Sequence, residues 1–177
     1  AYSFIFIKDK VSPKDMPFKL NRAQRRVLNK LEKLRKAGKP IKFILLKARQ
    51  WGGSTLVQIY MLWIMLVHRR NWNTVICGDV ETQSRNVRAM ITKALNKYPS
   101  YLLGETVKFT PFEGSSKNKV IQNTNCVVSI GSFQKPDTLR SGDISGAHLT
   151  EIGLWRATPG KKPEDLIQSI SCLLYTS

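Results

Sequence analysis

FILLKARQWGGST, residues 43–55, is the stretch that decides how the rest of this chain folds. Four apolar residues at 43–46 break abruptly into KARQWGGST at 47–55, and a new apolar segment with helical spacing begins at Leu56. The pattern predicts a buried strand over residues 41–46, then a tight loop, then the N-terminus of a helix.

A loop of this kind between a strand and a helix is suited to binding phosphate. Glycines let the backbone curl so that its N–H groups converge on an anion, and the helix dipole adds partial positive charge. Lys47 and Arg49 would supply full charges. The usual phosphate-loop pattern has a lysine directly before the hydroxyl residue, whereas this chain has Gly53 there. Taken alone, the stretch is equally compatible with an ordinary strand-to-helix turn.

The charge of the chain is strongly unbalanced. Among 177 residues, 29 Lys and Arg face 12 Asp and Glu, which gives a net charge of +17. Such an excess favours a polyanionic partner, because each phosphate neutralised by the protein releases condensed counterions. The alternatives are a basic protein without such a partner, or a fragment whose acidic complement lies elsewhere.

Apolar runs and cysteines give weaker information. No apolar run reaches the roughly 18 residues of a membrane span, so we expect no membrane partner. The cysteines, Cys77, Cys126 and Cys172, have no pairing or metal-binding spacing, which favours a reducing, cytoplasmic setting. The two histidines, His68 and His148, are too isolated to suggest a metal site, and we expect one at a helix end and one in a strand.

The other elements predict an α/β fold. Asn21 is a good N-cap for a helix ending near Gly38, and further helices are expected over residues 54–70 and 81–97. Strands are expected over residues 2–7, 74–77, 107–112, 119–122, 127–130 and 146–149. Strand-and-helix units followed by a meander predict a mostly parallel central sheet with added antiparallel strands.

A second chemical feature lies in residues 134–155. The weak strand over residues 146–149 delivers Thr150 and Glu151 at its carboxyl end. A carboxylate placed there, beside a phosphate loop, is able to orient water for attack on a γ-phosphate, although a single glutamate at a strand end is also a common structural feature. The upstream turn Arg140-Ser141-Gly142 either senses the phosphate or only reverses the chain. Gln24, in the first turn of its helix, has an amide suited to the edge of adenine, or is a solvated helix residue.

Taken in order, these pieces resemble the ATPase domain of the large terminase subunit, the genome-packaging motor of tailed bacteriophages. The resemblance covers residues 18–171 and rests on an ordered set of motifs rather than on any one of them. The motifs are LNRAQ at 20–24, KARQWGGST at 47–55, a second strand-helix unit, the turn at 140–142 and TEIGLW at 150–155. It implies a three-layer P-loop NTPase fold of the RecA/ASCE type.

The resemblance also implies a role for each matching residue. Gln24 would contact adenine, the backbone from Gln50 through Trp51, Gly52 and Gly53 would wrap the phosphates, and Ser54, with Thr55 adjacent, would bind Mg²⁺. Glu151 aligns with the catalytic glutamate of the family. Lys47 and Arg49 match a lysine and an arginine that family members carry early in this loop, and the choice between them stays open.

The chain departs from the family pattern at two positions. Gly53 replaces the usual loop lysine, so charge neutralisation falls to Lys47 or Arg49. Thr150 replaces an aspartate that helps to hold Mg²⁺ in many P-loop enzymes, which leaves the metal to Ser54, water and the nucleotide, with Thr150 a weak ligand.

The resemblance implies ATP hydrolysis with ATP and Mg²⁺, coupled to movement of double-stranded DNA into a procapsid. It implies a portal protein and a small terminase subunit as partners, a homo-oligomeric ring during packaging, and the host cytoplasm as location. The alternative hypotheses are another DNA-dependent or helicase-like P-loop ATPase, and a non-catalytic basic nucleic-acid-binding module. No nuclease carboxylate cluster follows Trp155, and residues 172–177 resemble a translated sequencing adapter, so we expect a partial ATPase domain over residues 1–171.

Overall fold

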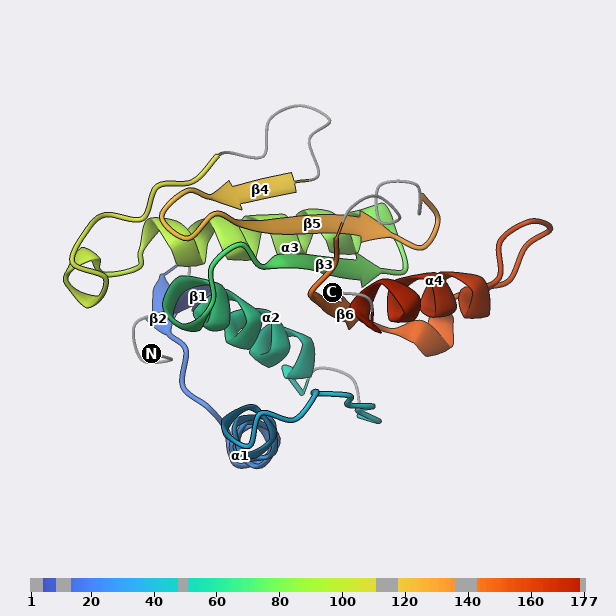
Figure 1. Ribbon diagram of the computed structural model, residues 1–177, viewed down its shortest axis with the longest axis horizontal. Coiled ribbons are helices and arrows are strands. Elements are labelled where there is room, and N and C mark those ends of the chain that lie inside the picture. Colours follow the sequence, from blue (N-terminus) through green and yellow to red (C-terminus); the bar gives the residue numbers. More distant parts are fainter. Residues whose placement is uncertain (1–4, 9–13, 48–50, 111–117, 136–142, 176–177) are drawn as a thin grey trace.

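The computed structural model describes residues 5–8, 14–47, 51–110, 118–135 and 143–175, with side chains as far as residue 172. A four-stranded sheet with the order β4-β5-β3-β6 lies at its centre. A separate two-stranded antiparallel sheet pairs β1 (Phe6–Lys8) with β2 (Asp15–Pro17) near the N-terminus. Figure 1 shows the arrangement.

The central sheet is mixed, as the sequence predicts. β3 (Asn73–Gly78) is its parallel core and pairs with both β5 (Cys126–Ser132) and β6 (Gly146–Leu149). β4 (Asn118–Ile121) is added antiparallel to β5. The apolar run of β3 is buried along nearly its whole length, which is typical of a parallel strand covered on both faces. The carboxyl ends of β3, β5 and β6 therefore meet at one edge of the sheet.

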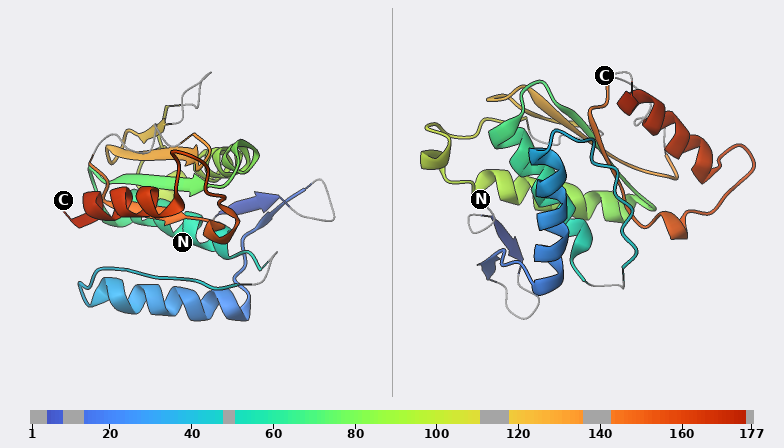
Figure 2. Two further views of the ribbon diagram at one scale, coloured as in Figure 1. Left: turned by 90° about the vertical axis from the view of Figure 1, so that its right-hand side faces the viewer. Right: turned by 60° about the horizontal axis from the view of Figure 1, so that its bottom comes forward.

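Helices cover both faces of this sheet (Figures 1 and 2). On one face, α2 (Gly53–Trp63), which continues as a π-helix (Ile64–His68), and α3 (Glu81–Asn96) pack against β3 and β5. On the other face, α4 (Pro163–Tyr175) packs against Val75 and Cys77 of β3. Alternate residues of β3 thus pack into two separate hydrophobic cores. Truncating a core side chain such as Ile91 of α3 to alanine would lower the free energy of unfolding by about 2–5 kcal/mol.

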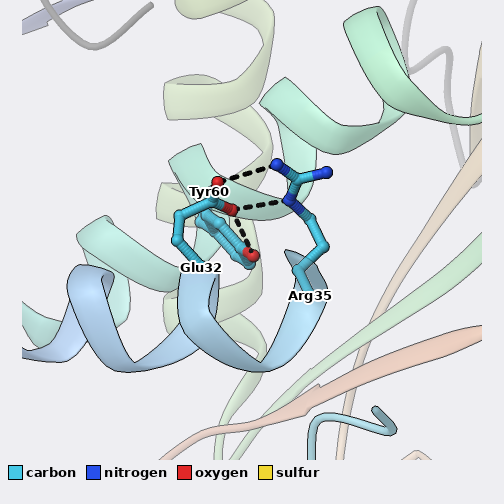
Figure 3. A network of polar contacts seen from close by, with 3 residues as sticks. All are labelled: Glu32, Arg35 and Tyr60. Carbon is cyan, nitrogen blue, oxygen red and sulfur yellow. Dashed lines mark hydrogen bonds and ion pairs between the residues drawn. The ribbon is translucent and has the colours of Figure 1, made fainter. Parts of the chain in front are cut away.

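The first helix, α1 (Arg22–Lys36), begins at Asn21 as predicted, with a capping box between Asn21 and Gln24. Its other end is attached to α2 by a polar network (Figure 3). Both the Arg35 guanidinium and the Tyr60 hydroxyl donate to the Glu32 carboxylate, with Tyr60 at 2.8 Å. The bond from Arg35 lowers the pKa of Glu32, and burial raises the pKa of Tyr60. The bond from Tyr60 to Glu32 joins α1, the helix that carries Gln24, to α2.

The predicted strand over residues 41–46 is wrong. Residues 41–47 have no strand assignment, and they return alongside α1 (Figure 2) with Ile44 98% and Leu46 100% exposed. An apolar run indicates a segment suited to burial, but a strand must also pair with a neighbouring strand. In the described part of the chain, the sheet ends at β6 and no strand pairs with this segment.

The predicted strand over residues 107–112 is reduced to a single bridge where it is described. Phe109 forms a single antiparallel bridge to Ile121, flanked by two backbone hydrogen bonds, and residues 111–112 lie outside the described residues. Short 3-10 helices follow α3 (Ser100–Leu102) and β6 (Ile152–Leu154). Among the described helices, none has both the length and the apolar composition needed to cross a bilayer.

Candidate nucleotide site

The loop before α2 ends in the turn that the sequence predicts. Gly52 has a φ of 77°, in the left-handed region that glycine adopts without strain, and it caps the helix. The Gly52 carbonyl accepts the Leu56 N–H at 3.0 Å, the first bond of the helix. Ser54 and Thr55 occupy the first helical turn, where backbone N–H groups lack partners within the helix and attract anions.

The side chains of Trp51 and Lys47 explain why position 53 is glycine. A Cβ added at Gly53 would lie 2.5 Å from the Trp51 ring and 2.9 Å from Cδ of Lys47. The space next to Gly53 is therefore already taken by the indole ring and by the stem of Lys47. A lysine at position 53 would need that space.

Gln24 is directed at the loop. Its Oε1 accepts the Asn21 N–H at 2.9 Å, and its Nε2 donates to the Gly52 carbonyl at 3.1 Å. The residue is only 4% exposed. A Cβ at Gly52 would lie 2.6 Å from Nε2, so Gly52 also makes room for this amide. Gln24 thus supports the loop from α1, and the predicted contact with adenine stays a prediction.

Ser54 and Thr150 meet although they lie far apart in the sequence. Their hydroxyl oxygens are 3.0 Å apart, and the Thr150 N–H donates to the Cys77 carbonyl at 2.9 Å, which continues the pairing of β6 with β3. Glu151 follows with a φ of 59°, an uncommon value for a non-glycine residue. A cavity of 260 Å³ joins the two segments and is lined by Ser54, Thr55, Gln58, Gln83, Asn86, Val87, Met90, Thr150 and Glu151.

The pKa of His148, in β6, is lowered by burial and by a nearby positive charge. Burial is the main cause of its pKa falling to about 4, and the Lys47 charge lowers it further. The imidazole is therefore neutral at physiological pH. Because the Lys47 charge lowers the pKa of a β6 residue, Lys47 lies close enough to influence the strand that precedes Thr150 and Glu151.

The oxygen donors of the cavity suit a hard cation better than a transition metal. In the part of the chain that the structure describes, no group of three or more His, Cys, Asp or Glu side chains is arranged to hold a metal ion. The hydroxyls of Ser54 and Thr150, with the Glu151 carboxylate nearby, are the type of ligand that Mg²⁺ accepts when nucleotide phosphates supply the remaining oxygens. The residues present therefore fit Mg²⁺ bound together with a nucleotide.

Some predicted site residues lie outside the described part of the chain, and the sequence analysis missed two residues that line the cavity. Arg49, Gln50 and the turn at 140–142 lie outside the described residues. Sequence reasoning did not single out Gln83 and Asn86, which line the cavity from α3. Their polarity looks like that of a solvated helix face. The signal that could have found them is position, since α3 begins just after β3 at the same sheet edge as Glu151.

A second, basic groove lies on α3. It has a volume of 590 Å³ and is lined by Arg85, Arg88, Ala89, Thr92, Lys93, Asn96 and Lys97. Part of its charge is already paired, because Arg88 contacts Glu81 at 2.7 Å and both Lys93 and Lys97 contact Asp15. These pairs are partly exposed and add little to stability.

Comparison with known proteins defines the fold. No protein-family model and no curated protein matches the chain. The class is an α/β domain with a mixed sheet that resembles a terminase domain. The chain is similar in structure to the HK97 bacteriophage large terminase, known from a crystal structure, with a TM-score of 0.72 and 20% sequence identity. The match covers 99% of this chain and 34% of that one, so this chain spans about a third of its length.

Proposed function

We propose that this chain is the ATPase domain of a terminase-like motor that uses ATP hydrolysis to move double-stranded DNA into a procapsid. The observation that carries the proposal is the meeting of Ser54, at the start of α2, with Thr150 and Glu151, at the end of β6. A phosphate-binding helix N-terminus beside a strand-end carboxylate is the arrangement needed for attack of water on a γ-phosphate. The likeness in fold to a phage large terminase supports the same reading.

In this proposal each group has a defined role. The N–H groups of Gly53, Ser54 and Thr55 bind the phosphates, and the Lys47 ammonium neutralises charge that develops on them. The Glu151 carboxylate orients the attacking water and accepts its proton. Ser54 and Thr150 would hold Mg²⁺, which when bound offsets the charge of the phosphate oxygens.

The proposed DNA partner is supported by charge. The chain carries +17, and four basic side chains line the groove along α3 and its C-cap, against the two carboxylates, Glu81 and Asp15, that pair with three of them. Such a surface suits a phosphate backbone without reading its sequence. The portal protein, the small subunit and a ring of copies belong to the same proposal and follow from the terminase likeness alone.

The experiment that tests the function is an ATPase assay on the chain and on Glu151→Ala, with and without double-stranded DNA. We expect measurable Mg²⁺-dependent hydrolysis that falls at least about 100-fold in the variant, since one positioned carboxylate is essential to this reaction type. Arg156→Ala is a matched control, because Arg156 is an exposed charged residue just beyond the same motif.

One alternative function has its own supporting observation. The missing lysine at position 53 and the missing aspartate at position 150 would suit a basic nucleic-acid-binding module without catalysis. Equal, background-level rates for the chain and Glu151→Ala would favour that module and would reject the ATPase. A helicase-like ATPase would instead hydrolyse ATP and unwind duplex DNA, which a strand-separation assay detects.

A further inference from the structure

The side chain of Gln83 bridges the ends of two strands. Gln83 lies in the first turn of α3, and its Oε1 accepts the N–H of Asp79, the residue after β3, at 3.0 Å. Its Nε2 donates to the Glu151 carboxylate, two residues beyond the end of β6. One amide thus connects the backbone at the end of β3 to the acid at the end of the neighbouring strand.

The orientation of this amide is determined by its partners. A backbone N–H can only donate, so the Gln83 oxygen must face Asp79 and the nitrogen must face Glu151. An ionised carboxylate has no hydrogen to donate, so it can act only as an acceptor. Glutamine satisfies both contacts at once, whereas glutamate at this position would keep the first contact and oppose Glu151 with a like charge.

Gly78 gives the amide its space. A Cβ added at Gly78 would lie 2.9 Å from Oε1 and 3.4 Å from Cβ of Gln83. The last residue of β3 therefore has no side chain at the place where Gln83 crosses the strand end. This steric relationship is independent of the hydrogen bonds and indicates that the chain is built around the crossing.

Glu151 needs such a restraint. The residue is exposed, and a free glutamate side chain samples many rotamers, each of which would misplace the carboxylate. The bond from Gln83 engages Oε2 and leaves the other carboxylate oxygen outside this contact, and Glu151 lines the cavity that Ser54 also lines. Holding one oxygen in this way selects a rotamer before the substrate arrives.

We propose that Gln83 is a positioning residue that holds the Glu151 carboxylate at the mouth of the Ser54–Thr150 cavity, so that its second oxygen orients the attacking water. Gln83 itself does not touch the reacting atoms. The inference rests on the proposed function, because it assigns to Gln83 a task that matters only if Glu151 takes part in hydrolysis.

The test is a kinetic comparison of Gln83→Met and Gln83→Glu with the unchanged chain. We expect kcat to fall about 10- to 100-fold in Gln83→Met, and at least as far in Gln83→Glu, while KM and the ATP affinity change less than about twofold. An unchanged kcat, or a loss carried by KM instead, would overturn the inference. Thr82→Ala, an exposed neighbour in the same helical turn, is the control and should leave both constants unchanged.

A second variant displaces the Gln83 side chain without replacing Gln83 itself. Gly78→Ala should push the amide away from Glu151, because the nearest obstructing atom is the end of a flexible side chain. We expect the kcat loss of Gln83→Met, and no further loss when the two changes are combined, since both remove one contact. Fully additive losses would overturn the shared mechanism. Thermal unfolding of each variant confirms that it is folded.

The Glu151→Gln variant distinguishes a failure of the inference about Gln83 from a failure of the proposed ATPase function. If Glu151→Gln abolishes hydrolysis and Gln83→Met does not lower kcat, the role of Gln83 is rejected and the ATPase assignment stands. If Glu151→Gln leaves hydrolysis unchanged, the assignment of Glu151 is rejected, and the inference about Gln83 is rejected with it.

Discussion

The hydroxyl of Ser54 lies 3.0 Å from the hydroxyl of Thr150, although 96 positions separate the two residues in the sequence. One residue belongs to the first turn of α2 and the other to the end of β6, so this contact joins the loop KARQWGGST to the motif TEIGLW. It is the point at which two sequence motifs with separate chemical meanings become one candidate site.

Replacing these hydroxyls should change the Mg²⁺ requirement of hydrolysis. We expect Ser54→Ala to lower kcat about 100-fold and Thr150→Val only about threefold to tenfold, because Ser54 also lies at the helix N-terminus that we propose binds phosphate. Both variants should need more Mg²⁺ for half-maximal rate, measured by titration at saturating ATP. An equal Mg²⁺ requirement in all three proteins would contradict a metal role for either hydroxyl.

Lys47→Ala should abolish hydrolysis. In the proposed mechanism the Lys47 ammonium neutralises charge that develops on the phosphates, so its removal should lower kcat at least about 100-fold. Lys39→Ala, an exposed lysine upstream, should have no effect in the same assay. If Lys47→Ala kept the rate and Arg49→Ala destroyed it, Arg49 would be the working cation.

Gly53→Ala should destabilise the chain and weaken nucleotide binding. The added methyl group would meet the Trp51 ring at 2.5 Å, and overpacking of this kind costs about 1–3 kcal/mol. Trp51→Ala in the same chain should restore part of the loss, measured by urea unfolding and by ATP affinity. Gly153→Ala, where an added Cβ meets nothing within 4 Å, is the control. Failure of Trp51→Ala to restore either quantity would reject the steric explanation.

Gln24→Ala should weaken ATP and GTP binding by the same factor. Both ends of the Gln24 amide are engaged, with Asn21 and with the Gly52 carbonyl, so its loss should loosen the loop and not the recognition of a base. The hydrogen bond to Gly52 is worth about 1 kcal/mol, or about fivefold in affinity. A larger loss for ATP than for GTP would reveal the adenine contact that the terminase resemblance predicts.

The contact between α1 and α2 should weaken in acid. The neighbouring Arg35 lowers the pKa of Glu32 from its ordinary value of 4.5, so the stabilisation is complete above that value and is lost as the pH falls through the lowered pKa. We expect Glu32→Gln to unfold more easily than the unchanged chain at pH 7 and the difference to shrink at pH 3, measured by urea unfolding. An equal difference at both pH values would contradict the ion pair.

Tyr60→Phe tests the same network without changing its charge. The ring stays packed and only the hydroxyl that donates to Glu32 at 2.8 Å is removed, so we expect a loss of about 1 kcal/mol in the free energy of unfolding at pH 7. Tyr101→Phe is the control, because Tyr101 is 72% exposed. Equal small effects in the two variants would show that the Tyr60 hydroxyl contributes nothing.

The elements that the sequence predicted correctly depend on local interactions. Asn21 caps α1 through a contact three residues away, and the apolar run of β3 indicates burial on both faces of a sheet. Gly52 adopts the left-handed conformation that the loop needs. Each of these features is set by hydrogen bonds, sterics or hydrophobic spacing within a few residues, so the order of residues alone was sufficient.

Tertiary structure alone decided which of these elements came together. Residues 41–46 have the composition of a buried strand, yet Leu46 is fully exposed, because strand pairing needs a partner that no local pattern supplies. Gln83 looks like a solvated helix residue and becomes a neighbour of Glu151 only because β3 and β6 run in parallel and end at the same edge. The sequence by itself determined the loop, the capped helix and the strand-end acid; the tertiary structure determined their meeting, because contacts across 68 or 96 positions depend on the whole sheet.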